Sequence, residues 1–151
     1  MSEPRFAIIV SRFNETITGR LLAGAEACFA DNGFKDNQVR VYFVPGAWEL
    51  PVAALHAARA GFSGIVAIGC VVRGDTPHFD YVAGGAADGL ARVSAETGVP
   101  IAFGVLTTET MDQALDRAGG KHGNKGYEAS QTVLEMVDLI GRIEEERAST
   151  Q

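Results

Sequence analysis

The histidine best placed for proton chemistry is His78. It closes the polar segment RGDTPH (residues 73–78), which follows a long apolar run and precedes a helical pattern. Imidazole titrates at about pH 6.5 and can both donate and accept protons near neutrality. An isolated histidine is more often a helix cap or a surface residue, but a position just after a strand favours general acid–base work. His56 has the setting of a helix-face residue, and His122, in a basic glycine-rich loop, fits either kind of role.

Two clusters could hold a phosphate group. Segment 73–78 leads into a helix N-terminus, where free backbone N–H groups and the helix dipole favour an anion, and Thr76 adds a hydroxyl. Arg117, with Lys121 and Lys125 nearby, forms either a phosphate clamp or an ordinary solvated loop. The chain has no GxxxxGK[ST] motif and no GxGxxG motif after its first strand, which argues against nucleoside triphosphate and dinucleotide ligands.

Two aromatic residues also follow strands. Phe13 and Trp48 could sandwich a planar heterocycle, although aromatic residues beside a sheet are more often part of a core or an interface. Glu49, next to Trp48, could accept hydrogen bonds from ligand hydroxyls or simply place a charge at a helix N-terminus. The spacing alone leaves both interpretations open.

Alternating strands and helices must position these side chains. Apolar, β-rich runs predict strands at 6–10, 39–44, 64–72 and 101–106. Helical spacing and capping signals predict helices at about 18–31, 49–60, 79–96, 110–117 and 127–146. This alternation is typical of the α/β class, here a three-layer α/β/α sandwich around a four-stranded parallel sheet, flavodoxin-like. Ligands of such folds bind at the C-terminal ends of the strands, where SRFN (11–14), PGAWE (45–49), RGDTPH (73–78) and TTET (107–110) all fall.

Glycine is unusually placed in two stretches. Gly84, Gly85 and Gly89 fall inside a predicted helix, where each costs about 1 kcal/mol relative to alanine, so something is expected to pack closely there. Residues 118–126 (AGGKHGNKG) have the composition of a loop. The last helix is expected to bury an apolar stripe formed by Val133, Met136, Val137, Ile140 and Ile143. The tail, residues 147–151, is expected to fray.

Composition limits the possible partners. The chain has 151 residues, enough for one domain over 1–151. A net charge of −6 argues against binding to nucleic acid or to an anionic membrane surface. The first apolar run, 6–10, ends at Ser11 and Arg12, too soon for a signal peptide or a membrane span. Cys28 and Cys70 lie in apolar settings without a metal-ligand pattern, which indicates reduced, buried thiols and a cytoplasmic location.

Five segments in order resemble the lumazine synthase family, and the resemblance runs from Phe6 to about Ile140. They are SRFN (11–14), VPGAWELP (44–51), GCVVRGDTPHFDYV (69–82), FGVLTTET (103–110) and QALDRAGGKHGNKG (113–126). The resemblance implies the condensation of 5-amino-6-(D-ribitylamino)uracil with 3,4-dihydroxy-2-butanone 4-phosphate. The products are 6,7-dimethyl-8-ribityllumazine, phosphate and water, in the penultimate step of riboflavin biosynthesis. Because the nucleophile is a substrate amine, no cofactor and no metal are implied.

The resemblance also implies a role for each matching residue. His78 matches the proton-transfer histidine. Residues that match the pyrimidine and ribityl site are Phe13, Ala47, Trp48, Glu49, Cys70, Val71, Val72, Phe103 and Lys125. Of these, Phe103 and Lys125 come from an adjacent subunit in this family. Asp75, Thr76 and Arg117 match the positions that bind the phosphate of the butanone phosphate.

A site shared between subunits implies an oligomer. The resemblance implies a homopentamer that can assemble into an icosahedral capsid, with riboflavin synthase as a candidate partner. The uninterrupted loop GGKHGNKG (119–126) is similar to that of capsid-forming members, whereas the family often has a longer N-terminal arm than the stretch 1–5 seen here. Gly84, Gly85 and Gly89 would fit close helix packing around a pentamer axis.

Two other classes remain open on the residues alone. A flavin-binding electron carrier of flavodoxin type shares the fold class, and residues 11–19 weakly resemble its hydroxyl-rich phosphate loop, although residues 12–14 interrupt it. A non-catalytic receiver or shell module is the second alternative. A receiver requires an acidic pair where Ser11 and Arg12 stand, and a pure shell has no use for His78.

Overall fold

A four-stranded parallel sheet forms the centre of the protein. The computed structural model describes residues 3–150. The strands are β1 (Phe6–Ser11), β2 (Val39–Val44), β3 (Gly64–Val72) and β4 (Ile101–Thr108), in the spatial order β2-β1-β3-β4. All neighbouring pairs are parallel, so the four C-terminal ends meet at one edge. This confirms the predicted α/β/α fold and its four strands.

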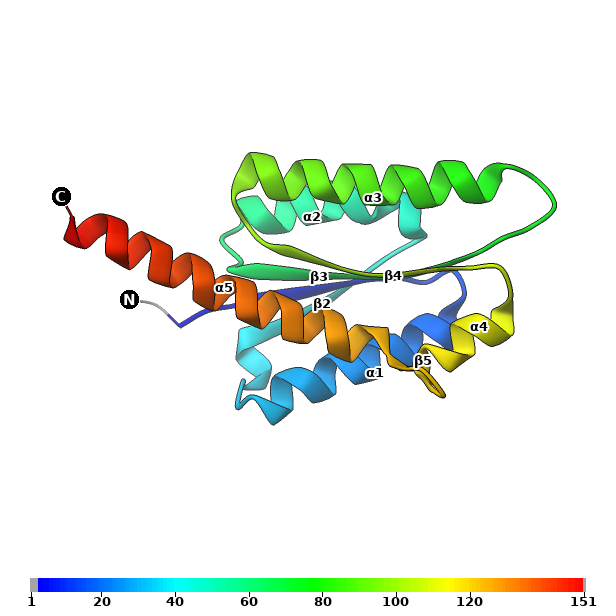
Figure 1. Ribbon diagram of the computed structural model, residues 1–151, viewed down its shortest axis with the longest axis horizontal. Coiled ribbons are helices and arrows are strands. Elements are labelled where there is room, and N and C mark those ends of the chain that lie inside the picture. The colour runs from blue at the N-terminus through cyan, green and yellow to red at the C-terminus, as the bar shows by residue number, and fades with distance from the viewer. Residues whose placement is uncertain (1–2, 151) are drawn as a thin grey trace.

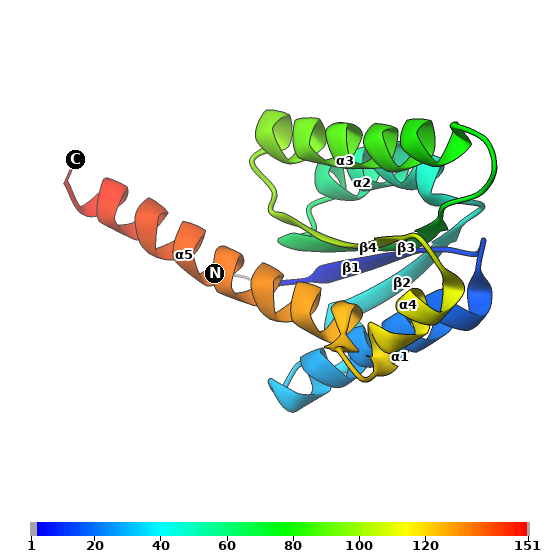
Figure 2. The ribbon, with the colours of Figure 1, turned by 45° about the vertical axis from the view of Figure 1, so that its right-hand side comes forward.

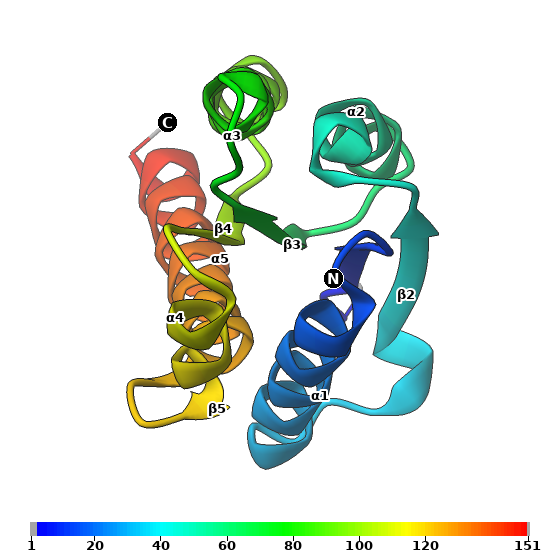
Figure 3. The same ribbon diagram turned by 90° about the vertical axis from the view of Figure 1, so that its right-hand side faces the viewer.

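Helices cover both faces of this sheet (Figure 1). One face carries α2 (Leu50–Arg59) and α3 (His78–Thr97), and the other carries α1 (Glu15–Asp31), α4 (Met111–Asp116) and α5 (Lys125–Ser149). The end-on view shows the three layers (Figure 3). Within residues 3–150, no helix is both long and apolar enough to cross a bilayer.

The alternation of β1 explains why two separate cores form. Phe6, Ile8 and Val10 point into the core shared with α1 and α5, whereas Ala7 and Ile9 point into the core shared with α2 and α3. Successive side chains of a strand face opposite sides of the sheet, so a strand covered on both faces must be apolar at every position. The uninterrupted run of β3 follows the same rule, since all but its last residue is buried.

Residues 118–126, expected to be a loop, contain a small antiparallel hairpin instead. Its strands are β5 (Ala118–Gly120) and β6 (Gly123–Asn124). Gly119 and Gly123 adopt φ values of 98° and 84°. Glycine adopts left-handed backbone without a steric penalty, because it has no Cβ. A segment with the composition of a loop can therefore close into a tight turn here.

Helix ends also differ from the expectation. The first helix begins at Glu15 rather than near residue 18, and α5 begins at Lys125 and continues to Ser149. The expected fraying of residues 147–151 is therefore wrong for residues 147–149, which are helical. Gln151 lies outside the described residues. An ion pair between Arg147 and Glu144, one turn apart, supports this last turn.

The apolar stripe of α5 is buried along only part of its length. Val133 is buried, but Met136 is 37% exposed and Ile143 is 52% exposed. A helix of 25 residues spans about 37 Å, whereas an eight-residue strand spans about 26 Å. The C-terminal part of α5 therefore runs past the sheet (Figure 2). The expectation that the whole apolar stripe is buried is wrong within a single chain.

The glycines of α3 allow neighbours within the same chain to approach. A Cβ at Gly85 would collide with the Trp48 indole and one at Gly89 with the Pro51 ring, whereas Gly84 faces open space. The expected close packing is thus present at two of the three positions. Trp48 lies in the segment that links β2 to α2, and Pro51 lies in the first turn of α2.

Candidate active site

The turns after β1, β2 and β3 are held together by hydrogen bonds. The Arg12 backbone N–H donates to the Val44 carbonyl (2.8 Å), and the Phe13 N–H donates to the Pro45 carbonyl (3.1 Å). Asn14 adopts left-handed backbone (φ 62°), and its side-chain amide donates to the Cys70 carbonyl at 2.9 Å. These bonds fix three strand ends relative to one another, as a rigid binding site requires.

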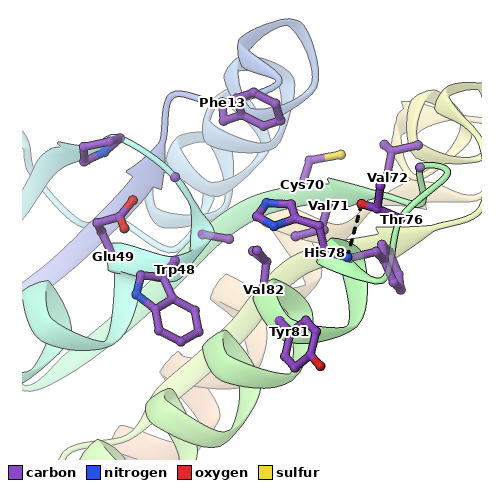
Figure 4. Close-up of a pocket in the computed structure, with 15 residues that line it drawn as sticks. Phe13, Trp48, Glu49, Cys70, Val71, Val72, Thr76, His78, Tyr81 and Val82 are labelled. Carbon is purple, nitrogen blue, oxygen red and sulfur yellow. Dashed lines mark hydrogen bonds between the residues drawn. The ribbon is translucent and has the colours of Figure 1, made fainter.

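A cavity of about 740 Å³ opens between these turns and the start of α3 (Figure 4). Predicted site residues that line it are Phe13, Ala47, Trp48, Glu49, Cys70, Val71, Val72, Thr76 and His78. Its wall is largely apolar, with Glu49 and His78 among its few polar groups. A mostly apolar cleft with a few convergent polar groups is typical of a small-molecule site.

The two predicted aromatic residues are exposed at this cavity rather than buried. Phe13 is 69% exposed and Trp48 is 59% exposed. Figure 4 shows them on opposite sides of the space into which the His78 imidazole points. Trp48 packs on the backbone of α3 at Gly85, because only a glycine there leaves room for the indole. The arrangement favours ligand stacking over a role in the core.

His78 is the first residue of α3. Its backbone N–H donates to the Thr76 hydroxyl at 3.4 Å, which links the proton-transfer candidate to the preceding polar turn. The side chain is exposed and therefore accessible to a ligand. The 20 residues of α3 direct the positive end of the helix dipole toward the turn formed by residues 74–76.

Cys70 forms part of the cavity wall without being reactive. Burial raises the pKa of its thiol to about 11. The nucleophilic form of cysteine is the thiolate, which is scarce at neutral pH when the pKa is that high. The side chain therefore acts as an apolar surface.

A second cavity, of about 540 Å³, lies at the outer side of β4, between α4 and α5. It contains three predicted site residues, Phe103, Arg117 and Lys125, and none of the residues that line the first cavity. Asp75 lines neither cavity, although Gly74 and Thr76 on both sides of it line the first. The structure thus divides the expected site into two parts within one chain, and it separates Arg117 from Thr76.

The local fold positions both cations of the second cavity. Thr110 caps α4 by accepting a hydrogen bond from the Gln113 N–H (3.1 Å), as the capping-box pattern predicts. Arg117 follows the helix and donates to the Gln113 carbonyl at 3.0 Å. The β5–β6 hairpin then returns the chain, so that the Lys125 N–H donates to the Arg117 carbonyl at 2.8 Å.

Several lining residues escaped the analysis of the sequence. Tyr81 and Val82 line the first cavity because they lie three and four residues after His78, on the same side of α3. Helical spacing could have identified them. Glu109, Gln113, His122 and Glu128 also line the second cavity. Of these, Glu109 lies in the TTET segment (107–110) that was expected at the ligand-binding edge. No local pattern signals His122 and Glu128, because the β5–β6 hairpin and α5 bring them to the cavity.

Comparison with known proteins points to one family. A family model described as 6,7-dimethyl-8-ribityllumazine synthase matches residues 3–141. A protein of that name from Chlorobium phaeobacteroides is 51% identical over 136 residues, covering 89% of this chain and 88% of the relative. Another from Syntrophus aciditrophicus is 50% identical over 140 residues, covering 92% and 91%. Similarity of this extent disfavours the flavodoxin-type and receiver alternatives.

Proposed function

This chain belongs to the 6,7-dimethyl-8-ribityllumazine synthase family, the transferases that make the lumazine precursor of riboflavin, and on that premise we propose how its residues share the reaction. The substrates are 5-amino-6-(D-ribitylamino)uracil and 3,4-dihydroxy-2-butanone 4-phosphate. The observation that carries the assignment of residues is the cleft in which Phe13 and Trp48 flank the His78 imidazole. We propose that residues 1–151 form one catalytic domain.

The pyrimidine binds in the first cavity. Phe13 and Trp48 provide aromatic faces for the heterocycle, and the backbone of Cys70, Val71 and Val72 forms the wall at the end of β3. Ala47 and Glu49 receive the ribityl chain, whose hydroxyls can donate to the Glu49 carboxylate. Exposure of both aromatic rings in the free chain supports this role, because the ligand would cover them.

The phosphate of the second substrate binds where two chains meet. Asp75 and Thr76 form the turn at the N-terminus of α3, where helix dipole and backbone N–H groups favour an anion. Arg117 of the neighbouring subunit supplies the opposing positive charge, and Phe103 and Lys125 of the same neighbour complete the pocket on the side of the pyrimidine. The separation of the two cavities within one chain supports this division.

His78 moves protons while the substrates supply the nucleophile. The 5-amino group of the pyrimidine attacks the ketone carbon, and loss of water gives an imine. A proton is then removed from the adjacent carbon and phosphate leaves, which generates a second carbonyl after tautomerisation. Attack by the ribitylamino nitrogen and loss of another water close the ring. Much of the acceleration comes from holding two reactants in one pocket, and none of these steps transfers electrons to a cofactor.

The family assembles into oligomers, and we propose a cytoplasmic homopentamer for this chain. A ring of five places the first cavity of each subunit against the second cavity of the next, which gives five complete sites. Further assembly of pentamers into an icosahedral capsid, or association with riboflavin synthase, would raise the particle mass above that of a pentamer. Measurement of the particle mass tests both. A pentamer of this 16.0 kDa chain and a capsid differ too much in mass to be confused.

The assignment of Arg117 is tested by its alanine variant. Lumazine formation is followed by fluorescence with each substrate varied in turn. Hydrogen bonds to a charged group contribute about 1.5–3 kcal/mol, so Arg117→Ala is expected to raise KM for the butanone phosphate by about 10- to 100-fold. KM for the pyrimidine should change little. Wild-type lumazine formation no faster than the spontaneous reaction would overturn the function, and an unchanged KM for the phosphate substrate would overturn the role of Arg117.

Glycine at position 85 is expected to set the position of Trp48. Gly85→Ala places a methyl group against the indole, and overpacking of this kind costs about 1 kcal/mol or more, so KM for the pyrimidine should rise about fivefold. Gly84→Ala is the matched control, because the neighbouring position faces open space. Equal KM values for the two variants would contradict the proposed contact between Trp48 and the pyrimidine.

A further inference from the structure

Arg73 connects three elements at the edge of the sheet where ligands are expected. It follows β3, and its backbone N–H donates to the Thr108 carbonyl at the end of β4 (2.9 Å). Its guanidinium Nε lies 2.9 Å from a carboxylate oxygen of Glu109, and Nη2 lies 3.4 Å from Oδ1 of Asp80, in the first turn of α3. The same guanidinium lies over the Phe79 ring, 4.4 Å from its centre.

These contacts place Arg73 between the two cavities. On one side, Phe79 and Asp80 directly follow His78, whose N–H bonds to Thr76. On the other side, the Glu109 N–H donates to the Gln113 side-chain oxygen at 2.9 Å, and the carbonyl of that same glutamine accepts from Arg117. A continuous series of bonds therefore runs from the phosphate turn and His78, through Arg73, to the arginine of the second cavity.

We propose that Arg73 is a positioning residue that sets the start of α3, and with it Thr76 and His78, relative to the β4–α4 turn that carries Arg117. The proposal rests on the function proposed above. Since the two cavities of one chain belong to different complete sites in a ring, each Arg73 then serves two active sites. Arg73 lines neither cavity and acts only through its neighbours.

The chemistry of arginine suits this task better than that of lysine. A planar guanidinium directs its N–H groups at fixed angles, so one side chain can hold two carboxylates and rest on an aromatic ring at the same time. An ammonium group is a point charge that does not reproduce this geometry. The side chain of Arg73 is 40% exposed, and ion pairs at such positions contribute little to global stability. Variants at position 73 should therefore fold, and the effect should be kinetic.

The experiment compares Arg73→Met, Arg73→Lys and Arg142→Met in the full-length protein. Arg142 forms an exposed ion pair with Asp138 on α5, away from both cavities, and is the matched control. For Arg73→Met we expect kcat/KM for the butanone phosphate to fall about tenfold, with KM for the pyrimidine unchanged, because a small misplacement of reacting groups lowers the rate. Arg73→Lys should recover only part of this loss, and Arg142→Met should match the wild type. The proposal is overturned if Arg73→Met retains wild-type constants, or if both KM values rise together with a lower melting temperature.

A double variant tests the route through Glu109. If Arg73 acts through that carboxylate, the double variant Arg73→Met/Glu109→Gln should have the same kcat/KM as the less active of the two single variants. Effects that simply multiply would show that the two residues act independently and would overturn the route.

Amide exchange keeps this test separate from the proposed function. In the absence of substrates, Arg73→Met should increase exchange about fivefold in both 76–82 and 109–117, whereas Arg142→Met should not. If the wild type makes no lumazine but this exchange pattern appears, the function fails and the positioning role stands. If the wild type makes lumazine but Arg73→Met leaves this exchange unchanged, the function stands and the positioning role fails.

Discussion

Replacing His78 with alanine is expected to slow lumazine formation by about 10²-fold under single-turnover conditions. General acid–base catalysis contributes about 10²–10⁴-fold, and the low end applies here because a substrate amine, not the protein, is the nucleophile. KM for the pyrimidine should change little, since Phe13 and Trp48 remain in place. The measurement is the fluorescence of the lumazine product after rapid mixing with both substrates.

His56→Ala is the control for His78→Ala. It removes an exposed histidine from α2, outside both cavities of the site, and should leave the rate unchanged. Residual activity of His78→Ala above the spontaneous reaction is expected, because orientation of the two reactants does not depend on the imidazole. A wild-type rate in His78→Ala would remove the proton-transfer role.

Mixing the two impaired variants is expected to restore activity, measured with the butanone phosphate well below the KM of Arg117→Ala. His78→Ala damages the first cavity and Arg117→Ala damages the second, so a subunit of either kind still carries one intact cavity. In the proposed ring, mixed at random, half of the first cavities and half of the second cavities are intact. About a quarter of the sites therefore combine two intact parts, and activity should recover to about a quarter of the wild-type value.

The mixing experiment requires exchange of subunits. The two variants are dissociated together in mild denaturant and reassembled, and the recovered activity is compared with that of each variant treated alone. A mixture of His78→Ala with the double variant His78→Ala/Arg117→Ala is the matched control, because no ring of these chains contains an intact first cavity. If the site lay within one chain, the mixture of single variants would gain nothing over its components.

Two of the strands, β1 and β3, were predictable because both of their faces are buried. A strand covered on both faces must be apolar at every position, and the run from Gly64 to Val72 has this property over its full length. The hairpin of 118–126 could not be predicted in the same way, because its strands of three and two residues are too short for a periodic signal. The exposure of Met136 and Ile143 depends on where the sheet ends relative to α5, which local spacing does not encode.

The first cavity could be inferred from the sequence because of a topological rule. In a parallel sheet the C-terminal ends lie together, so Phe13, Trp48 and His78 had to converge once their strands were identified. The same rule does not separate Arg117 from Thr76, since it says nothing about which side of the sheet a connection takes. Only the three-dimensional arrangement shows that the residues expected at one phosphate lie in different cavities.

Position 14 illustrates how few residue types a single site can tolerate. Asparagine and glycine accept left-handed backbone at low cost, and aspartate does so as well. Glycine there would lose the bond that ties the β1–α1 turn to the Cys70 carbonyl. Aspartate would point an acceptor at an acceptor, and a branched residue would resist the φ of 62°. Asn14 combines a low cost for this backbone with a short side-chain donor to that carbonyl, so the position has little mutational freedom.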